Sequence, residues 1–112
     1  MAPERPEKRR GQVWWARVDK RRTVLLLSRP EAYAVRRRVV AAEITTNLRF
    51  NAATVELGPR DGLPARCIAN LDNLVTVNQD DLVEYVTTLT PARMESVRSA
   101  LLFAVGCDEG GG

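Results

Sequence analysis

Apolar and polar residues alternate first along Gly11–Val18, and this period of two predicts a β-strand with one buried face. Trp14 and Trp15 are neighbours in this strand, so the alternation directs their rings to opposite faces and places at least one in the core. After the charged residues 19–22, Thr23–Leu27 run without a strongly polar residue, which is typical of a strand covered on both sides and predicts a strand over Thr23–Ser28. These segments predict a buried hairpin with a charged turn.

Further segments with the composition or alternation of short strands are residues 35–46, 53–57, 66–71, 73–77 and 82–89. Residues 31–33 form a connection with room for one helical turn. In 35–46 the alanines leave a helix as the alternative, although the ending Ile44–Asn47 favours a strand. The segments on either side of Asp72 are two strands or one bent strand, and Gly58–Gly62 is a turn cluster.

The clearest helix is the last element. Thr90 is a good N-cap, and Pro91 stands at the first helical position, where its missing N–H costs nothing. Leu89 and Met94 have the spacing of a hydrophobic staple, and Gly106 can end the helix in a left-handed conformation. The apolar stripe comprises Met94, Val97, Leu101 and Ala104 or Val105.

Several short strands followed by one helix predict a mainly β fold, a small and strongly curved sheet or barrel with a C-terminal helix. We expect a flexible basic arm over residues 1–10, a single domain over 11–106 and a flexible tail over 107–112.

The charge of the chain is unevenly distributed. Through Arg49 the Lys and Arg residues exceed the acidic ones by 8, whereas after Arg49 the acidic residues exceed them by 5. This asymmetry indicates a polyanionic partner such as nucleic acid for the first half, the alternative being scattered solvated arginines. With 112 residues, no apolar run near the roughly 20 that span a bilayer and no signal-type segment, we expect a soluble cytoplasmic protein.

Cys67 and Cys107 are the two cysteines, and the chain contains no histidine. A structural zinc site needs four nitrogen or sulfur ligands, so no metal cofactor is expected, and both thiols are expected to be reduced. Any catalysis must use carboxylates, arginine, lysine, hydroxyls or thiols.

The cations Lys20, Arg21 and Arg22 are the first candidate site, because guanidinium groups hold two phosphate oxygens at once. The alternative is a turn kept in water by its charges. Hydroxyl and amide groups that could orient a phosphate or a ribose follow in Thr45, Thr46 and Asn47, with Arg49 close behind. The alternative is structural, because threonine is common in strands and asparagine in turns.

Glu43 interrupts an apolar strand. If its carboxylate points inward it must pair with an arginine, because an unpaired buried charge is costly, and catalysis as a general base is the weaker alternative.

In their order along the chain these segments resemble the MazF/PemK family, the toxin components of bacterial toxin–antitoxin pairs. The similarity spans about residues 11–106 and rests on Gly11-Gln12-Val13-Trp14, on Arg22–Ser28, on Ala42–Thr46, on Asp72–Val77 and on Leu89–Met94. Thr23 replaces the proline usual at its position, and the Gly-rich loop that typically joins the first two strands is reduced to Asp19–Arg21.

The resemblance implies an SH3-like barrel, a homodimer, and a sequence-selective, metal-independent endoribonuclease that cuts single-stranded RNA (mRNA, tRNA or rRNA) and is neutralised by an acidic antitoxin. It implies catalytic roles for Arg22 and Thr45, and attack by the ribose 2′-OH, giving a 2′,3′-cyclic phosphate and a 5′-hydroxyl end. RNA contacts are expected from Lys20, Arg21, Thr46, Asn47 and Arg49.

Two alternatives stay open at this point. Arg21 stands one position from Arg22, although strand alternation and the register of the apolar run favour Arg22 as the catalytic residue. The same barrel can also serve as a non-catalytic module that binds RNA or poisons gyrase.

Overall fold

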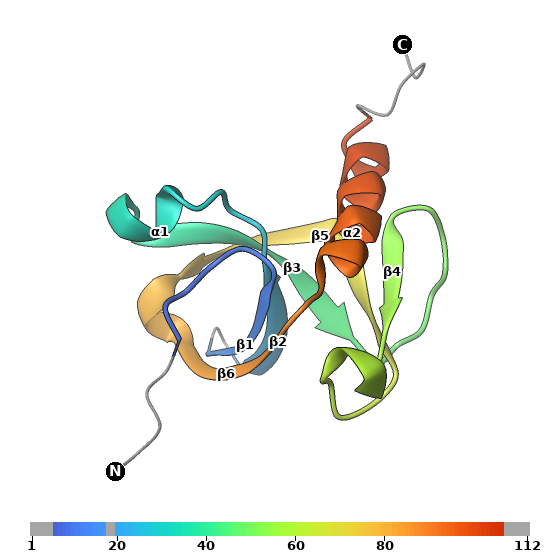
Figure 1. The fold of residues 1–112 in the computed structure, drawn as a ribbon, viewed down its shortest axis with the longest axis horizontal. Coiled ribbons are helices and arrows are strands. Elements are labelled where there is room, and N and C mark those ends of the chain that lie inside the picture. Colours follow the sequence, from blue (N-terminus) through green and yellow to red (C-terminus); the bar gives the residue numbers. More distant parts are fainter. Residues whose placement is uncertain (1–5, 18–19, 107–112) are drawn as a thin grey trace.

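Six antiparallel strands form one curled sheet, and the last helix packs against one of its faces in this computed structural model (Figure 1). The structure describes residues 6–17 and 20–106. The expected tail, half of the expected arm, Val18 at the end of the first expected strand and Asp19 of the expected turn lie outside the described residues. The predicted class, a mainly β curved sheet with a C-terminal helix, is confirmed.

The strands follow one another in the sheet in the order β4-β5-β3-β2-β1-β6. Their bounds are β1 Gln12–Arg17, β2 Arg21–Leu26, β3 Arg38–Thr45, β4 Thr54–Leu57, β5 Cys67–Asn78 and β6 Leu82–Thr88. The helices are α1 Ala32–Val35 and α2 Pro91–Ala104, and single turns of 3-10 helix are η1 Pro59–Asp61 and η2 Gln79–Asp81.

The starts of two strands differ from the sequence-based expectation. β2 begins at Arg21 rather than Thr23, because pairing with β1 continues to Arg17 and Arg21. Val35 ends a short helix, and the strand expected from it begins at Arg38. Of the alternatives left open, residues 38–45 form a strand rather than a helix, and the segments around Asp72 form one strand.

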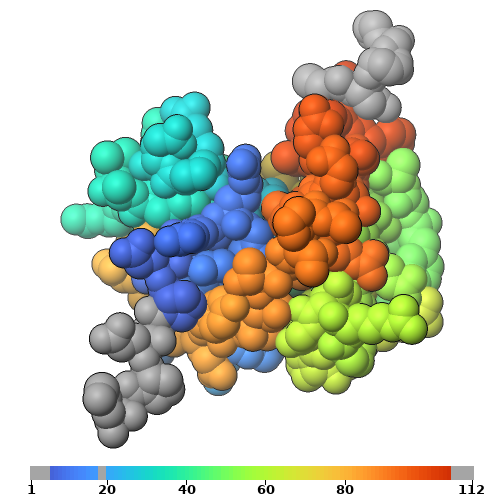
Figure 2. Space-filling view, viewed as in Figure 1, coloured from blue at the N-terminus to red at the C-terminus, as the bar shows by residue number. Residues whose placement is uncertain are grey.

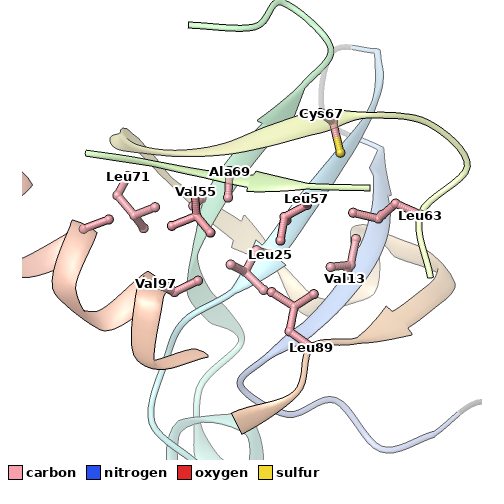
Figure 3. Close-up of a cluster of buried hydrophobic side chains, with 12 residues drawn as sticks. Val13, Leu25, Val55, Leu57, Leu63, Cys67, Ala69, Leu71, Leu89 and Val97 are labelled. Atoms are coloured by element: carbon pink, nitrogen blue, oxygen red, sulfur yellow. The ribbon is translucent and has the colours of Figure 1, made fainter. Parts of the chain in front are cut away.

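The alternation of β1 and β2 fills two separate cores. One core lies under α2 and includes Val13, Leu25 and Val97 (Figure 3). The other lies inside the curl of the sheet and includes Trp14 and Val24. Trp14 is fully buried while Trp15 is half-buried, so the two rings do take opposite faces.

A local irregularity of β5 sharpens the curl of the sheet. Ala42 of β3 pairs with Leu74, but the next residue, Glu43, pairs with Asn70, so residues 71–73 of β5 fall between paired positions. Such a bulge bends a strand and increases its twist. Within it, the Asp72 N–H donates to Asn70 Oδ1 at 3.0 Å.

Gly11, directly before β1, is hydrogen-bonded to the end of β2 and to the residue that follows β6. Its N–H donates to the Leu26 carbonyl and its carbonyl accepts from the Leu89 N–H, each at 2.9 Å. Gly11 has a φ of 93°, a conformation that favours glycine, and an added Cβ would lie 3.5 Å from Met94 Sδ.

The segment before β1 packs between α1 and α2, where Figure 2 shows it in blue between the cyan and orange surfaces. The buried Gln12 side chain holds it: Gln12 Nε2 donates to the Glu7 carbonyl and Gln12 Oε1 accepts from the Arg9 N–H, both at 2.8 Å. The same oxygen accepts from Trp14 Nε1 at 2.9 Å.

α2 has the predicted ends. Thr90 Oγ1 accepts from the Arg93 N–H at 3.2 Å, and Gly106 has a φ of 75° just beyond the last turn. Leu89 and Met94 both belong to the core beneath the helix. No helix in the described part of the chain is long and apolar enough to cross a membrane.

Candidate active site

Arg22 and Glu43 form an ion pair on the face of the sheet that carries Val24. Arg22 Nη1 donates to Glu43 Oε2, and the two side chains are 36% and 19% exposed. The other carboxylate oxygen, Glu43 Oε1, accepts from Asn73 Nδ2 at 3.0 Å. The expectation that Glu43 pairs with an arginine is confirmed. The guanidinium is therefore fixed by a carboxylate that is itself held on both oxygens.

The local fold explains why these three side chains meet. Glu43 pairs directly with Val24 on β2, two residues after Arg22, so their side chains share a face. Asn73 is the last residue of the bulge in β5 and stands next to Leu74, which pairs with Ala42, the residue before Glu43. The bulge turns the Asn73 amide toward β3.

Thr45 is the last residue of β3 and lies at the same end of the sheet. The register pairs Thr23 with Ile44, and one further step along it sets Thr45 opposite Arg22. Thr45 Oγ1 accepts from the Asn47 N–H at 3.0 Å. Because the oxygen is used as an acceptor there, the hydroxyl hydrogen remains able to donate to a substrate oxygen.

Arg21 lies on the opposite face of β2. Its guanidinium lies 4.8 Å from the centroid of the Trp15 ring, and its Nη2 pairs with Glu84 Oε1 on β6. Arg21 and Arg22 thus point to different neighbourhoods, and only Arg22 shares a face with Glu43 and Thr45.

The other predicted site residues lie in the connections at this end of the sheet. Lys20 is exposed directly before β2, and an exposed loop after β3 carries Thr46, Asn47 and Arg49. The start of β2 and the end of β3 are adjacent because the strands are antiparallel. These four residues therefore flank the Arg22–Glu43 pair on two connections, whereas Arg21 lies within β2.

Two residues of the site were not singled out from the sequence. Asn73 stands in a segment that carried the family resemblance, but its contact depends on the β5 bulge. Glu84 was one acidic residue among many, and only the pairing of Trp15 with Glu84 across β1 and β6 brings it to Arg21.

The Arg22 side chain is 36% exposed, so the site is partly open to solvent. A hollow of about 850 Å³ lies elsewhere, between β4 and α2, and its lining includes none of the predicted site residues. Among residues 6–17 and 20–106, no group of three or more Cys, Asp or Glu residues is arranged to hold a metal ion. Fixed donors on an open face are suited to a polymeric anion.

Comparisons with a family model and with known proteins indicate the same family. Residues 9–105 match the family described as PemK-like, MazF-like toxin of type II toxin–antitoxin system. Over 101 residues the chain is 39% identical to the probable endoribonuclease MazF5 of Mycobacterium tuberculosis, covering 88% of this chain and 93% of that protein.

Solved structures agree with this match. An endoribonuclease from a mycobacterial species is 32% identical, with a TM-score of 0.80 over 92% of this chain and 95% of that one. A second mycobacterial endoribonuclease, solved in complex with its cognate antitoxin, is also 32% identical, with a TM-score of 0.81 over 88% of this chain and 95% of that one. The family resemblance inferred from the sequence is confirmed.

Proposed function

This chain belongs to the PemK-like, MazF-like toxin family of type II toxin–antitoxin systems, and we propose that it is a sequence-selective endoribonuclease that cuts single-stranded RNA without a metal ion. The observation that carries the proposal is the Arg22 guanidinium, which Glu43 and Asn73 hold in place opposite Thr45.

Cleavage needs no protein nucleophile. The ribose 2′-oxygen attacks the adjacent phosphorus and loses its proton, the bond from phosphorus to the 5′-oxygen breaks, and that oxygen takes up a proton. The products are a 2′,3′-cyclic phosphate end and a 5′-hydroxyl end. This chemistry is compatible with a chain that has no histidine.

Arg22 is proposed to stabilise the negative charge that develops on the phosphorane. A donor held in place before the reaction is effective because no reorganisation is needed as charge appears. Arg22 meets this condition, since its carboxylate partner is anchored by a second residue on β5. Thr45 is proposed to donate its hydroxyl hydrogen to a non-bridging phosphate oxygen, and Arg22 to assist proton transfer.

The flanking loops are proposed to bind the RNA chain. Thr46, Asn47 and Arg49 are exposed after β3, and Lys20 is exposed before β2, so their side chains can reach phosphates on either side of the cut. Arg21 adds positive charge from the opposite face of β2, where Glu84 partly neutralises it.

The partners proposed are a second copy of the chain and a cognate antitoxin. The related mycobacterial endoribonuclease was solved in complex with its antitoxin, which supports a similar partner here. An acidic, partly disordered antitoxin segment suits a chain whose first half carries an excess of Lys and Arg. An RNA substrate and an antitoxin partner together suit a cytoplasmic protein.

The proposal is tested by incubating long single-stranded RNA with the wild-type protein and with Arg22→Ala, in the presence of EDTA. We expect wild-type cutting to persist in EDTA and Arg22→Ala to lose at least about 100-fold in kcat, the usual effect of removing one charge-stabilising donor. Analysis of the ends must detect the cyclic phosphate.

Arg21→Ala is the matched variant, because it removes the same group from the opposite face of the strand. We expect it to weaken RNA binding and to retain kcat. Equal loss in both variants would remove the distinction between the two arginines. If the pure wild-type protein cuts no RNA, the chain is a non-catalytic binding module.

A further inference from the structure

We propose that Phe50 and Arg66 form a stacking site for an RNA base next to the cleavage position. This proposal rests on the proposed ribonuclease function and adds a substrate contact to it. Phe50 is 56% exposed, and the Arg66 guanidinium lies over its ring, 5.3 Å from the centroid. An aromatic ring paired with arginine is a common platform for single-stranded nucleic acid.

The platform is anchored to the sheet. Arg66 Nε donates to Glu56 Oε2 at 2.5 Å, and Glu56 belongs to the edge strand β4. The carboxylate thus holds the guanidinium over the ring from one side. The Arg22–Glu43 pair has the same arrangement, since there too a glutamate on a neighbouring strand holds an arginine at the surface.

The platform and the Arg22 site lie in one row across the sheet. Glu56 pairs with Ile68 on β5, Ile68 pairs with Thr45 on β3, and Thr45 stands opposite Arg22 in the continued register. Residues directly opposite one another share a face. The row from β2 to β4 covers three strand spacings, about 14 Å. A short stretch of single-stranded RNA can therefore contact both ends of it.

The loop between the two sites adds polar groups along this path. It leaves β3 after Thr45 and returns to the sheet at Thr54, passing on the outer side of β4 in Figure 1. Arg49 and Asn51, on either side of Phe50, are both exposed. The ring thus has a charged contact in Arg66 and exposed polar residues on either side of it in the chain, which favours a nucleic-acid base over a protein hot spot.

The first test measures binding without cleavage. Equilibrium binding of a mixed-sequence single-stranded RNA is compared between Arg22→Ala and the double variant Arg22→Ala, Phe50→Ala at one fixed salt concentration. We expect Phe50→Ala to weaken binding by roughly 5- to 100-fold, the effect of losing one stacked base. Phe50→Trp must retain the affinity. Phe103→Ala, which removes a similarly exposed ring from α2, must leave it unchanged.

The second test locates the base. After the wild-type cut sites are mapped, oligonucleotides carry an abasic nucleotide at successive positions around the cut. We expect one position at which the abasic substitution slows the wild-type protein but has no further effect on Phe50→Ala. Identical abasic profiles for the two proteins would overturn the inference while leaving the ribonuclease assignment intact.

Two further outcomes separate the inference from its rivals. If Phe50→Ala keeps full RNA affinity and loses affinity only for an antitoxin peptide, the ring is a protein contact and the inference is wrong. If the wild-type protein cuts no RNA, the proposed function fails, and the binding comparison still decides whether Phe50 holds a base.

Discussion

The fully buried Trp14 depends on a single acceptor, and replacing Gln12 by leucine removes it. Gln12 is 4% exposed and Trp14 is 0% exposed. In Gln12→Leu the Trp14 indole N–H loses the acceptor that lies 2.9 Å away, in a position that water cannot reach without disturbing the core. A buried donor left without a partner costs about 1–3 kcal/mol.

The other two hydrogen bonds of Gln12 are lost as well. They hold the Arg9 N–H and the Glu7 carbonyl, which are only partly buried and can turn to water, so each contributes at most about 1 kcal/mol. Removal of the buried amide offsets part of this loss. We expect Gln12→Leu to lower the free energy of unfolding by about 2–3 kcal/mol.

The measurement is urea unfolding of four proteins: wild type, Gln12→Leu, Trp14→Phe and the double variant. Phenylalanine has no N–H, so the cost of Gln12→Leu must fall by about 1–3 kcal/mol in the Trp14→Phe background. Gln79→Leu is the control. Gln79 Nε2 donates to the Tyr33 and Arg36 carbonyls, so its loss orphans no buried donor. A Gln12→Leu protein as stable as wild type, or no coupling with Trp14, would refute the reasoning.

Two further predictions concern a turn and an ionisable side chain. Gly62 has a φ of 91°, and an added Cβ would overlap the Thr87 hydroxyl and lie 2.8 Å from Thr87 Cβ. We therefore expect Gly62→Ala to lower the thermal unfolding temperature more than Gly106→Ala does. Gly106 has the same left-handed conformation, which costs an alanine about 1–2 kcal/mol, but an added Cβ there meets no other atom within 4 Å. Equal losses of stability in the two variants would exclude an effect of the overlap with Thr87. Burial raises the pKa of Tyr33 from 10.0 to about 12, although the charge of Arg10 acts in the opposite direction. As the pH rises, Tyr33 therefore loses its proton in the unfolded chain before it does so in the folded protein. The free energy of unfolding should thus fall between pH 10 and 12. Urea unfolding across this range should show a weaker decline in Tyr33→Phe, and parallel declines would contradict the burial effect.

The sequence predicted the mainly β architecture because its strands alternate and its helix has strong end signals at Thr90 and Gly106. The start of β2 was misplaced, since two adjacent arginines are typical of a turn. In the fold each pairs with a glutamate, Arg22 with Glu43 on the adjacent strand β3 and Arg21 with Glu84 on β6 beyond β1, and pairing of β2 with β1 extends to Arg21. Such pairs join residues far apart in the chain, which local propensity does not register.

The candidate site was predictable to the extent that each residue carries a local signal. Glu43 interrupts an apolar strand, and a carboxylate that points inward there predicts an arginine partner. Asn73 gave no comparable signal, because a bulge that omits residues 71–73 from pairing with β3 is a property of the whole sheet. Phe50 was also missed, since its significance depends on Arg66 and on the row of pairs that leads back to Thr45.

The position of β1 between β2 and β6 has a consequence for the chain during its synthesis. Trp14 pairs with Val24 soon after both are made, but its other neighbour, Tyr85, follows about seventy residues later. At ordinary rates of translation this delay lasts roughly 4 to 14 s, during which β1 is an open edge able to pair with other chains. The side chains of Arg22, Glu43 and Asn73 are all synthesised before that edge closes. We therefore expect closure of β1 against β6 to be the slow, late step of folding, because contacts between distant residues form slowly.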